Sequence, residues 1–210
     1  MSRQNNALPQ MVEPLWSTYI HQKGARLGLP VTGTFELTPR CNFNCNMCYV
    51  HQTEAQAAQG GRRELTTAEW LAIAEEARKA GMVFLLLTGG EPLLRPDFPE
   101  LLHALKNMGF LVSVNSNGSL LRGELLEAVK RDPPLRFNIT LYGGSNAAYE
   151  RLCGRAMFRE VVDNLRALKD AGIPVRLNVS VTPDNKDDVP EIFRLARELG
   201  LHTKASTYMY

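Results

Sequence analysis

The chain has 210 residues, of which 44% are hydrophobic and 22% charged, and its formal net charge is +2 at pH 7. That length suits one domain with a sizeable core, and the near-neutral charge gives no electrostatic reason to expect a nucleic-acid partner. Because no apolar run approaches the roughly 20 residues that span a bilayer and the start lacks the apolar stretch of a secretory signal, we expect a cytoplasmic protein without a membrane segment.

The first 32 residues are expected to form an N-terminal extension to the domain at 33–210. Pro9, Gly24 and Pro30 are among the residues that interrupt any long helix there. An amphipathic segment at 11–22 is expected to dock on the body of the domain.

From residue 33 onward, strand-like runs alternate with helical patterns. Six strands are predicted, at 33–38, 83–88, 111–115, 135–141, 175–182 and 202–208. Apolar runs such as 84–87 suit a parallel sheet that is covered by helices.

Five helices are predicted between the strands, at 66–80, 97–108, 120–131, 158–171 and 187–199. Several of them are followed by a glycine, which is the usual C-terminal stop of a helix. Five strand–helix units and a sixth strand predict an α/β fold with two candidate architectures, an open doubly wound sheet or a partial (β/α)6 TIM-like barrel with parallel strands. Both architectures place functional groups at the carboxyl ends of the strands.

Three of the four cysteines, Cys41, Cys45 and Cys48, follow the first predicted strand directly. Thiolates at this spacing are poorly placed for mutual disulfides but suit one soft metal centre. They offer one ligand fewer than a structural zinc site or an ordinary ferredoxin cluster, so one coordination position would stay open. The fourth cysteine, Cys153, is interpreted as a partly buried small side chain.

The next predicted strands end in glycine-rich or polar segments at the same edge of the sheet. Gly89 and Gly90 would let the backbone approach a ligand closely, and Glu91 offers a carboxylate to an ammonium group. Residues 115–118 after the third strand are small and hydrogen-bonding, and 140–144 after the fourth strand combine a threonine with two glycines. We therefore expect these segments to form one ligand site with the cysteines.

The spacing C-x3-C-x2-C resembles the signature of radical S-adenosylmethionine (SAM) enzymes, and the glycine–glycine–glutamate segment resembles the GGE motif of that family. The resemblance covers residues 33–208. It implies that the three cysteines hold three irons of a [4Fe–4S] cluster and that the amino and carboxylate groups of SAM chelate the fourth. Met47 departs from the family pattern, which usually has an aromatic residue at that position.

The resemblance also implies contacts to SAM from several parts of the chain. The implied SAM-binding residues are Met47, Tyr49, Gly89, Gly90, Glu91, Asn115, Asn117, Thr140 and Arg151. Among them, the GGE residues would meet the amino group, Asn115 and Asn117 would lie near the ribose, and Arg151 would lie near the carboxylate.

The activity that the resemblance implies is reductive cleavage of SAM to a 5′-deoxyadenosyl radical, which abstracts hydrogen from a substrate. Residues 33–38, 142–145 and 149–154 resemble the corresponding segments of radical SAM enzymes that carry a SPASM or twitch region. Many of those enzymes modify peptides or proteins. The expected partners are a peptide or small-molecule substrate and a reductant such as flavodoxin or ferredoxin. The auxiliary clusters of such regions need several more cysteines, and only Cys153 remains.

Two other interpretations stay open. The cysteines would form a zinc site if His51 supplied a fourth ligand, which would make the protein a zinc-stabilised binding module. Alternatively, the chain is an inactive, truncated radical SAM core, because no helix follows the sixth predicted strand. No catalytic residue is assigned, and Tyr49, Tyr142 and Tyr149 are interpreted as packing residues rather than radical relays.

Overall fold

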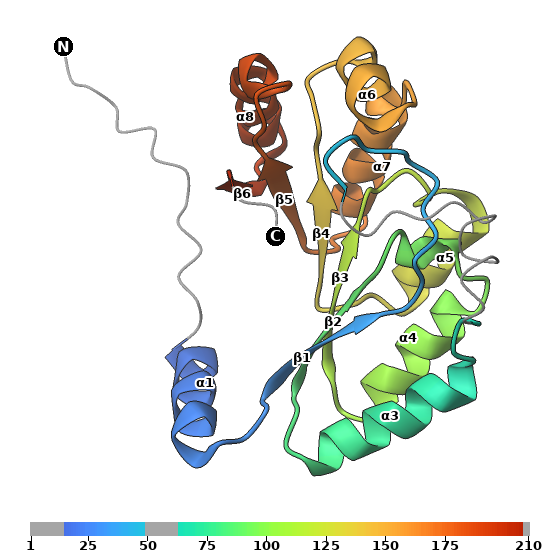
Figure 1. The fold of residues 1–210 in the computed structure, drawn as a ribbon, viewed down its shortest axis with the longest axis vertical. Helices are drawn as coiled ribbons and strands as arrows, with labels where there is room; N and C mark the ends of the chain where they lie inside the picture. Colours follow the sequence, from blue (N-terminus) through green and yellow to red (C-terminus); the bar gives the residue numbers. More distant parts are fainter. Residues whose placement is uncertain (1–14, 49–62, 208–210) are drawn as a thin grey trace.

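The computed structural model describes residues 15–48 and 63–207 (Figure 1). Its strands are β1 (Thr32–Glu36), β2 (Phe84–Thr88), β3 (Leu111–Ser116), β4 (Arg136–Thr140), β5 (Val175–Ser180) and β6 (His202–Ser206). They form one sheet in the order β1-β2-β3-β4-β5-β6, and every neighbouring pair is parallel. Sequential order without closure confirms the partial (β/α)6 TIM-like barrel, whereas a doubly wound sheet would reverse its strand order at a switch point.

The connecting helices lie mainly on one side of this sheet. The helices are α1 (Leu15–Leu27), α3 (Thr67–Lys79), α4 (Phe98–Asn107), α5 (Gly123–Arg131), α6 (Asn146–Cys153), α7 (Phe158–Asp170) and α8 (Val189–Leu199), with short 3₁₀ helices η1 (Pro92–Leu94) and η2 (Lys186–Asp188). In Figure 1, α3, α4 and α5 run along one side of the sheet and α1 lies on the other.

Alternate strand residues form the core against the helices. Leu85, Leu87, Val112 and Val114 are at most 1% exposed, and they pack in one cluster with helix residues such as Leu101. Their neighbours along the strands point to the opposite side, which we call the open face of the sheet. One row of the open face is Thr34, Leu86, Ser113 and Arg136, in register across β1 to β4. The apolar run in β2 therefore packs against the connecting helices on one face, while its open face meets α1 at Phe84.

The N-terminal helix extends further than its prediction. In the described part α1 spans Leu15–Leu27, so it continues past the expected end at residue 22 and passes through Gly24 without a break. Residues 11–14 of the predicted segment lie outside the described residues. A Cβ at Gly24 would lie 2.4 Å from the Val31 side chain, so glycine lets the helix approach the segment that leads into β1. Trp16 and His21 stack on Phe84, with ring centroids 6.0 and 4.8 Å away. The helix thus docks on the amino end of the open face, as the amphipathic pattern predicted.

One helix was absent from the prediction. α6 begins after Ser145, whose hydroxyl accepts a hydrogen bond from Ala148 N–H, and it ends at Gly154 with φ 68°. These two residues are standard start and stop signals, but only eight residues separate them. Such a short helix between strand and helix falls outside simple strand–helix alternation.

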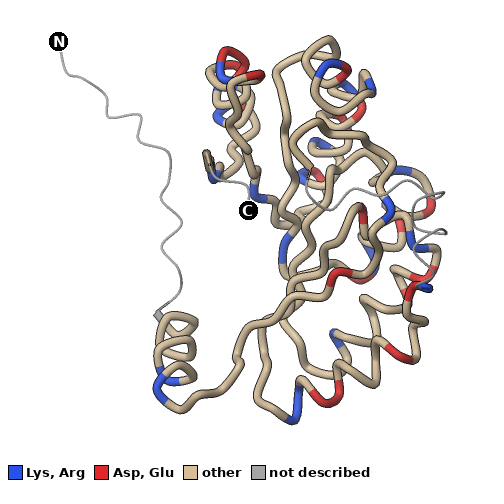
Figure 2. The backbone as a smooth tube through the Cα atoms, in the orientation of Figure 1, with Lys and Arg blue, Asp and Glu red and all other residues tan. Residues whose placement is uncertain are grey.

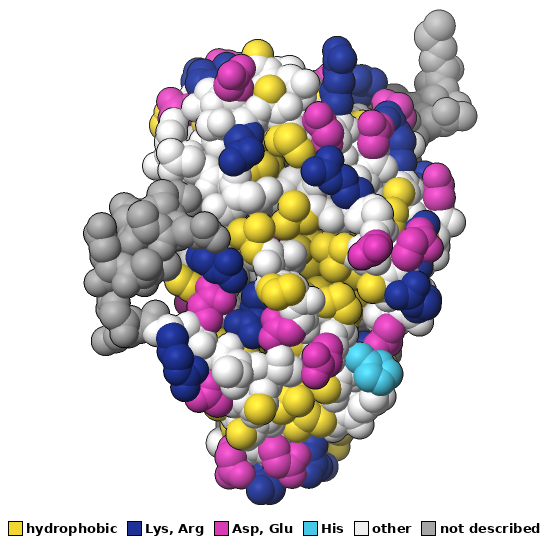
Figure 3. Space-filling view, turned by 90° about the vertical axis from the view of Figure 1, so that its right-hand side faces the viewer, with side chains coloured by type: hydrophobic (Ala, Val, Ile, Leu, Met, Phe, Trp, Pro, Cys, Tyr) yellow, Lys and Arg dark blue, Asp and Glu magenta, His cyan; other side chains and the backbone are white. Residues whose placement is uncertain are grey.

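The described surface carries both charge signs. Figure 2 shows basic and acidic residues interspersed along the helices. The face in Figure 3 likewise has basic and acidic side chains beside one another around a central group of hydrophobic ones, so that face has no continuous basic surface. None of the described helices is long and apolar enough to cross a membrane.

Candidate metal and cofactor site

The cysteine loop starts where β1 ends and stays attached to the end of β2. Leu37 N–H donates to Thr88 O over 2.8 Å, which continues the ladder by one residue. Beyond it, Gly90 N–H donates to Thr38 O, and Glu91 N–H donates to Arg40 O at 2.8 Å. The loop and the glycine–glycine–glutamate segment are therefore joined by backbone hydrogen bonds at the carboxyl edge of the sheet.

Gly89 and Gly90 are required by this close approach. A Cβ at Gly89 would lie 2.4 Å from Thr38 O, and one at Gly90 would lie 2.2 Å from Arg40 O. Gly89 also has φ 141°, where a side chain is strained. The structure thus gives both glycines a role inside the protein, and their expected contact with SAM stays a prediction.

The three thiols differ in environment. Cys41 and Cys45 are partly buried, and Cys48 is exposed. Burial raises the pKa of Cys41 to about 11, while Phe43 N–H donates to its Sγ over 3.4 Å. The donor types suit an iron–sulfur cluster. However, no group of three or more His, Cys, Asp or Glu within residues 15–48 and 63–207 could hold a metal ion as arranged.

Cys45 is also the neighbour of the fourth cysteine. A hydrogen bond from the Cys153 thiol lowers the pKa of Cys45, and the Tyr142 hydroxyl acts in the same direction. Cys153 itself is fully buried in the core, beyond the partial burial that we expected. Tyr142 and Tyr149 pack edge to face with centroids 5.8 Å apart, as expected for packing residues.

The unpredicted helix α6 holds the cysteine loop from the other side. Asn44 N–H donates to Cys153 O at 2.9 Å, and Asn46 N–H donates to Leu152 O at 3.0 Å. The Asn46 side-chain amide adds a bond to Arg151 O at 3.2 Å. The last carbonyls of a helix lack partners within it, so the loop satisfies groups that the helix leaves unpaired. The loop is thereby clamped between β2 and α6.

Glu91 is completely buried beneath this loop. Its carboxylate accepts hydrogen bonds from Leu93 N–H at 3.1 Å, Ser116 Oγ at 2.8 Å and Asn117 N–H at 2.8 Å. Burial nevertheless raises the pKa of Glu91 to about 7, because the three bonds offset only part of the desolvation and no cation in the described part contributes. An ammonium group placed beside this carboxylate would supply the missing positive charge.

This buried acid predicts a pH-dependent stability. A free glutamate titrates near pH 4.3, so between that pH and about 7 the folded state binds more protons than the unfolded state at this group. Its contribution is therefore complete at low pH and is lost as pH rises through 7. We expect urea unfolding to show about 2 kcal/mol less stability at pH 8 than at pH 5.5 from this group. The neutral variant Glu91→Gln should lack that component, and equal pH slopes in both proteins would contradict the assignment.

Of the polar residues after β3, Asn117 contacts the cysteine loop. Asn117 Nδ2 donates to Asn42 Oδ1 at 2.9 Å and lies 3.9 Å from Cys41 Sγ. Asn115 lies on the open face and accepts from Asn138 Nδ2 at 2.9 Å. The structure therefore brings Cys41, Glu91 and Asn117 together, although the predicted contacts of Asn115 and Asn117 with SAM stay untested.

The remaining predicted residues are more scattered. Thr140 ends β4 on the open face, and Met47 is partly buried against the core. Arg151 is 55% exposed on α6 and forms an ion pair with Asp188 at 3.3 Å. Its expected position near the SAM carboxylate stays a prediction that would require this ion pair to open. Tyr49, together with His51 of the zinc interpretation, lies outside the described residues.

A buried arginine that sequence reasoning did not single out stabilises the base of the loop. Arg95 is 6% exposed; it donates to Leu37 O at 3.2 Å and to Leu65 O at 3.0 Å, and it forms a bidentate pair with Asp97 at 2.9 and 2.6 Å. Glu64 lies 3.6 Å from the same guanidinium and pairs with Arg40 of the cysteine loop at 2.7 Å. The sequence signal that could have indicated this buried arginine is its position directly after the apolar turn of η1.

Comparison with known proteins matches the chain to the family that the cysteine spacing resembles. The profile of the Radical SAM superfamily matches residues 35–196. The probable GTP 3′,8-cyclase of Saccharolobus solfataricus is 32% identical over 180 residues, which cover 84% of this chain and 56% of that protein. The PqqA peptide cyclase of Gluconobacter oxydans is 34% identical over 174 residues, covering 81% and 47%.

Among solved structures, Streptococcus suis SuiB bound to its precursor peptide SuiA superposes with a TM-score of 0.73 at 17% identity. The match covers 98% of this chain and 47% of SuiB, and at that identity it supports the fold alone. The chain spans about half the length of the curated relatives that it matches.

Proposed function

The chain belongs to the radical SAM superfamily, and from that premise we propose that it binds a [4Fe–4S] cluster and SAM and cleaves SAM reductively. The observation that carries the proposal is the position of the cysteine loop directly over Glu91, a buried carboxylate without a cationic partner in the described part. Thiolates are ligands for iron–sulfur clusters, and the carboxylate offers a counter-charge to an amino group.

Each residue of the site has a distinct task in this proposal. Cys41, Cys45 and Cys48 would hold three irons, which leaves the fourth to the amino and carboxylate groups of SAM. The Asn117 amide beside Cys41 Sγ would hydrogen-bond a cluster ligand, and such bonds tune reduction potentials. When bound, the cluster would supply one electron to the sulfonium of SAM, so that one carbon–sulfur bond breaks to give methionine and a 5′-deoxyadenosyl radical. The protein must hold substrate within van der Waals reach and exclude water.

The proposed substrate class rests on the relatives of the chain. The relatives include a probable GTP 3′,8-cyclase and a PqqA peptide cyclase, and SuiB is bound to a precursor peptide. We therefore propose a peptide or small-molecule substrate, with a reductant such as flavodoxin or ferredoxin.

The test is anaerobic reconstitution of the full chain with iron and sulfide. We expect roughly four irons per chain and 5′-deoxyadenosine after reduction with dithionite in the presence of SAM. A colourless protein with one zinc per chain would instead support the zinc-stabilised binding module. A loaded cluster without any 5′-deoxyadenosine would support the inactive core.

A further inference from the structure

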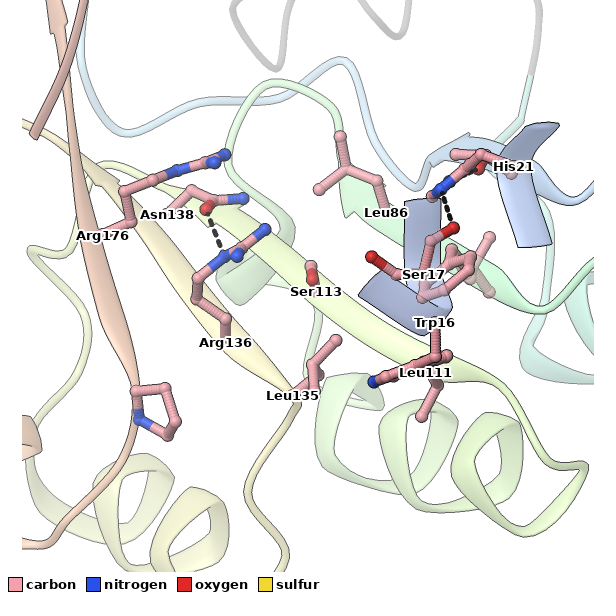
Figure 4. Close-up of a pocket in the computed structure, with 14 residues that line it drawn as sticks. Trp16, Ser17, His21, Leu86, Leu111, Ser113, Leu135, Arg136, Asn138 and Arg176 are labelled. Carbon is pink, nitrogen blue, oxygen red and sulfur yellow. Dashed lines mark hydrogen bonds between the residues drawn. The ribbon is translucent and has the colours of Figure 1, made fainter. Parts of the chain in front are cut away.

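A cavity of about 650 Å³ lies on the open face of the sheet, at the end opposite to the cysteine loop (Figure 4). Its walls come from the amino-terminal halves of β2, β3, β4 and β5, and α1 closes one side with Trp16 and His21. His21 is fixed there: its Nδ1 lies 2.8 Å from Ser17 O, and its Nε2 lies 2.9 Å from Thr32 Oγ1. Because the Ser17 carbonyl can only accept, Nδ1 is the donor.

The lining combines an apolar floor with basic groups. Phe84, Leu86 and Leu111 are among its apolar members, whereas Arg136 and Arg176 bring two positive charges. No Asp or Glu of the described chain is among the residues that line the cavity. The described lining therefore carries more basic than acidic side chains.

Arg176 has no hydrogen-bond acceptor or carboxylate partner within the described residues. Its Nε is completely buried and unsatisfied, and burial lowers the pKa of Arg176. A guanidinium nitrogen that is buried without an acceptor is unfavourable, and a bidentate carboxylate or phosphate is a common partner for such a group. A negative group beside this side chain would satisfy the buried Nε.

Arg136 is positioned to share that group. Figure 4 shows Arg136, Asn138 and Arg176 side by side, projecting to the same side of the sheet. Arg136 Nε donates to Asn138 Oδ1 at 3.0 Å, and Asn138 Nδ2 donates to Asn115 Oδ1 at 2.9 Å. Asn138 is 3% exposed, so this chain of amides holds Arg136 with little freedom.

We propose that this cavity binds an anionic group of the substrate, a carboxylate or a phosphate, between Arg136 and Arg176, with the apolar part of the substrate on Phe84 and Leu86. The inference rests on the proposed function, because the cavity and the candidate SAM site share the open face. From Arg136 to Thr140 the strand advances four residues, or about 13 Å at 3.3 Å per residue. A substrate whose reacting carbon lies about that far from its anion would reach the carboxyl edge of the sheet.

Isothermal titration calorimetry on the full chain with its reconstituted cluster tests this inference with three probes of equal chain length. Octanoate and octyl phosphate distinguish a carboxylate site from a phosphate site, and octanamide is the uncharged control. We expect the better of the two anions to bind at least about tenfold more tightly than octanamide, because hydrogen bonds to charged groups are the stronger ones.

Arg176→Gln should remove that preference, whereas Arg176→Lys should retain part of it. The matched control is Arg166→Gln, since Arg166 pairs only with Asp163 on the exposed side of α7 in the described structure. Arg176 has no side-chain partner among residues 15–48 and 63–207, so Arg176→Gln should melt at the same temperature as the wild type or higher.

Equal binding of anions and octanamide, or no binding of any probe, would overturn the inference even if every variant failed to fold. Persistence of the preference in folded Arg176→Gln would overturn the role of Arg176. Anion binding without 5′-deoxyadenosine formation would contradict the proposed function while leaving the cavity assignment in place. Formation of 5′-deoxyadenosine without anion binding would contradict the cavity assignment while leaving the proposed function in place.

Discussion

Replacement of Cys48 by alanine is expected to abolish cluster binding while the protein stays folded. Cys48 is exposed, and its backbone N–H bond to Cys45 O at 3.0 Å does not depend on the side chain. Misfolding would therefore not explain a loss of iron from this variant. Two remaining thiols should not retain the cluster, so iron should fall from roughly four per chain to near zero. Formation of 5′-deoxyadenosine should fall by more than about a hundredfold, the upper range for loss of an outer-shell partner.

The matched control is Cys153→Ala. Cys153 touches Cys45 but belongs to the buried core, so this variant should lose some stability and keep its iron. Iron and sulfide analysis, absorption spectra and circular dichroism of the variants would be compared. Full iron content in Cys48→Ala, or loss of iron from a folded Cys153→Ala, would contradict the assignment of ligands.

Arg95→Met should lower the free energy of unfolding by about 3–5 kcal/mol, because breaking a buried ion pair leaves its partner uncompensated. Methionine occupies similar volume but leaves the carbonyls of Leu37 and Leu65 without their donor and Asp97 without its bidentate partner. For a domain of this size, 1 kcal/mol corresponds to about 2–4 °C, so the melting temperature should fall by roughly 10 °C. Because Leu37 precedes the cysteine loop, we also expect slower or incomplete cluster loading.

Arg166→Met is the control for that experiment. Arg166 pairs with Asp163 at 2.9 Å on the surface of α7, where such pairs contribute about 0.5 kcal/mol or less. Urea denaturation at pH 7 would give the free energy for both variants. Similar values for the two would mean that the Arg95 network contributes no more than a surface ion pair.

The sequence was informative wherever the signal is local. Thr66 is the N-cap of α3, and Glu69 completes the capping box, because these residues interact within one turn of the chain. The strand prediction at 175–182 overlaps β5 for the same reason, since the strand pattern depends on consecutive residues. The helix at 146–153 was missed because its eight residues are short beside the strand and helix that flank it.

In the candidate site, too, local features could be predicted and long-range contacts could not. The spacing of Cys41, Cys45 and Cys48 predicted a shared soft-metal site, because thiols that close in sequence lie on one loop. The groups that surround those thiols come from residues distant in the sequence. Cys153 is 108 positions from Cys45 and still donates to its sulfur. No period or motif encodes a contact of that kind.

What the sequence determined by itself is the parallel strand–helix order, the close spacing of three thiols and the edge of the sheet where they lie. Only the tertiary structure decided that Glu91 is buried beneath the loop, that Arg151 pairs with Asp188, and that Arg176 has no partner in the described part. The physical reason is that hydrogen bonding and desolvation depend on which groups the folded chain brings together. Sequence patterns specify elements and donor types, whereas packing specifies their partners.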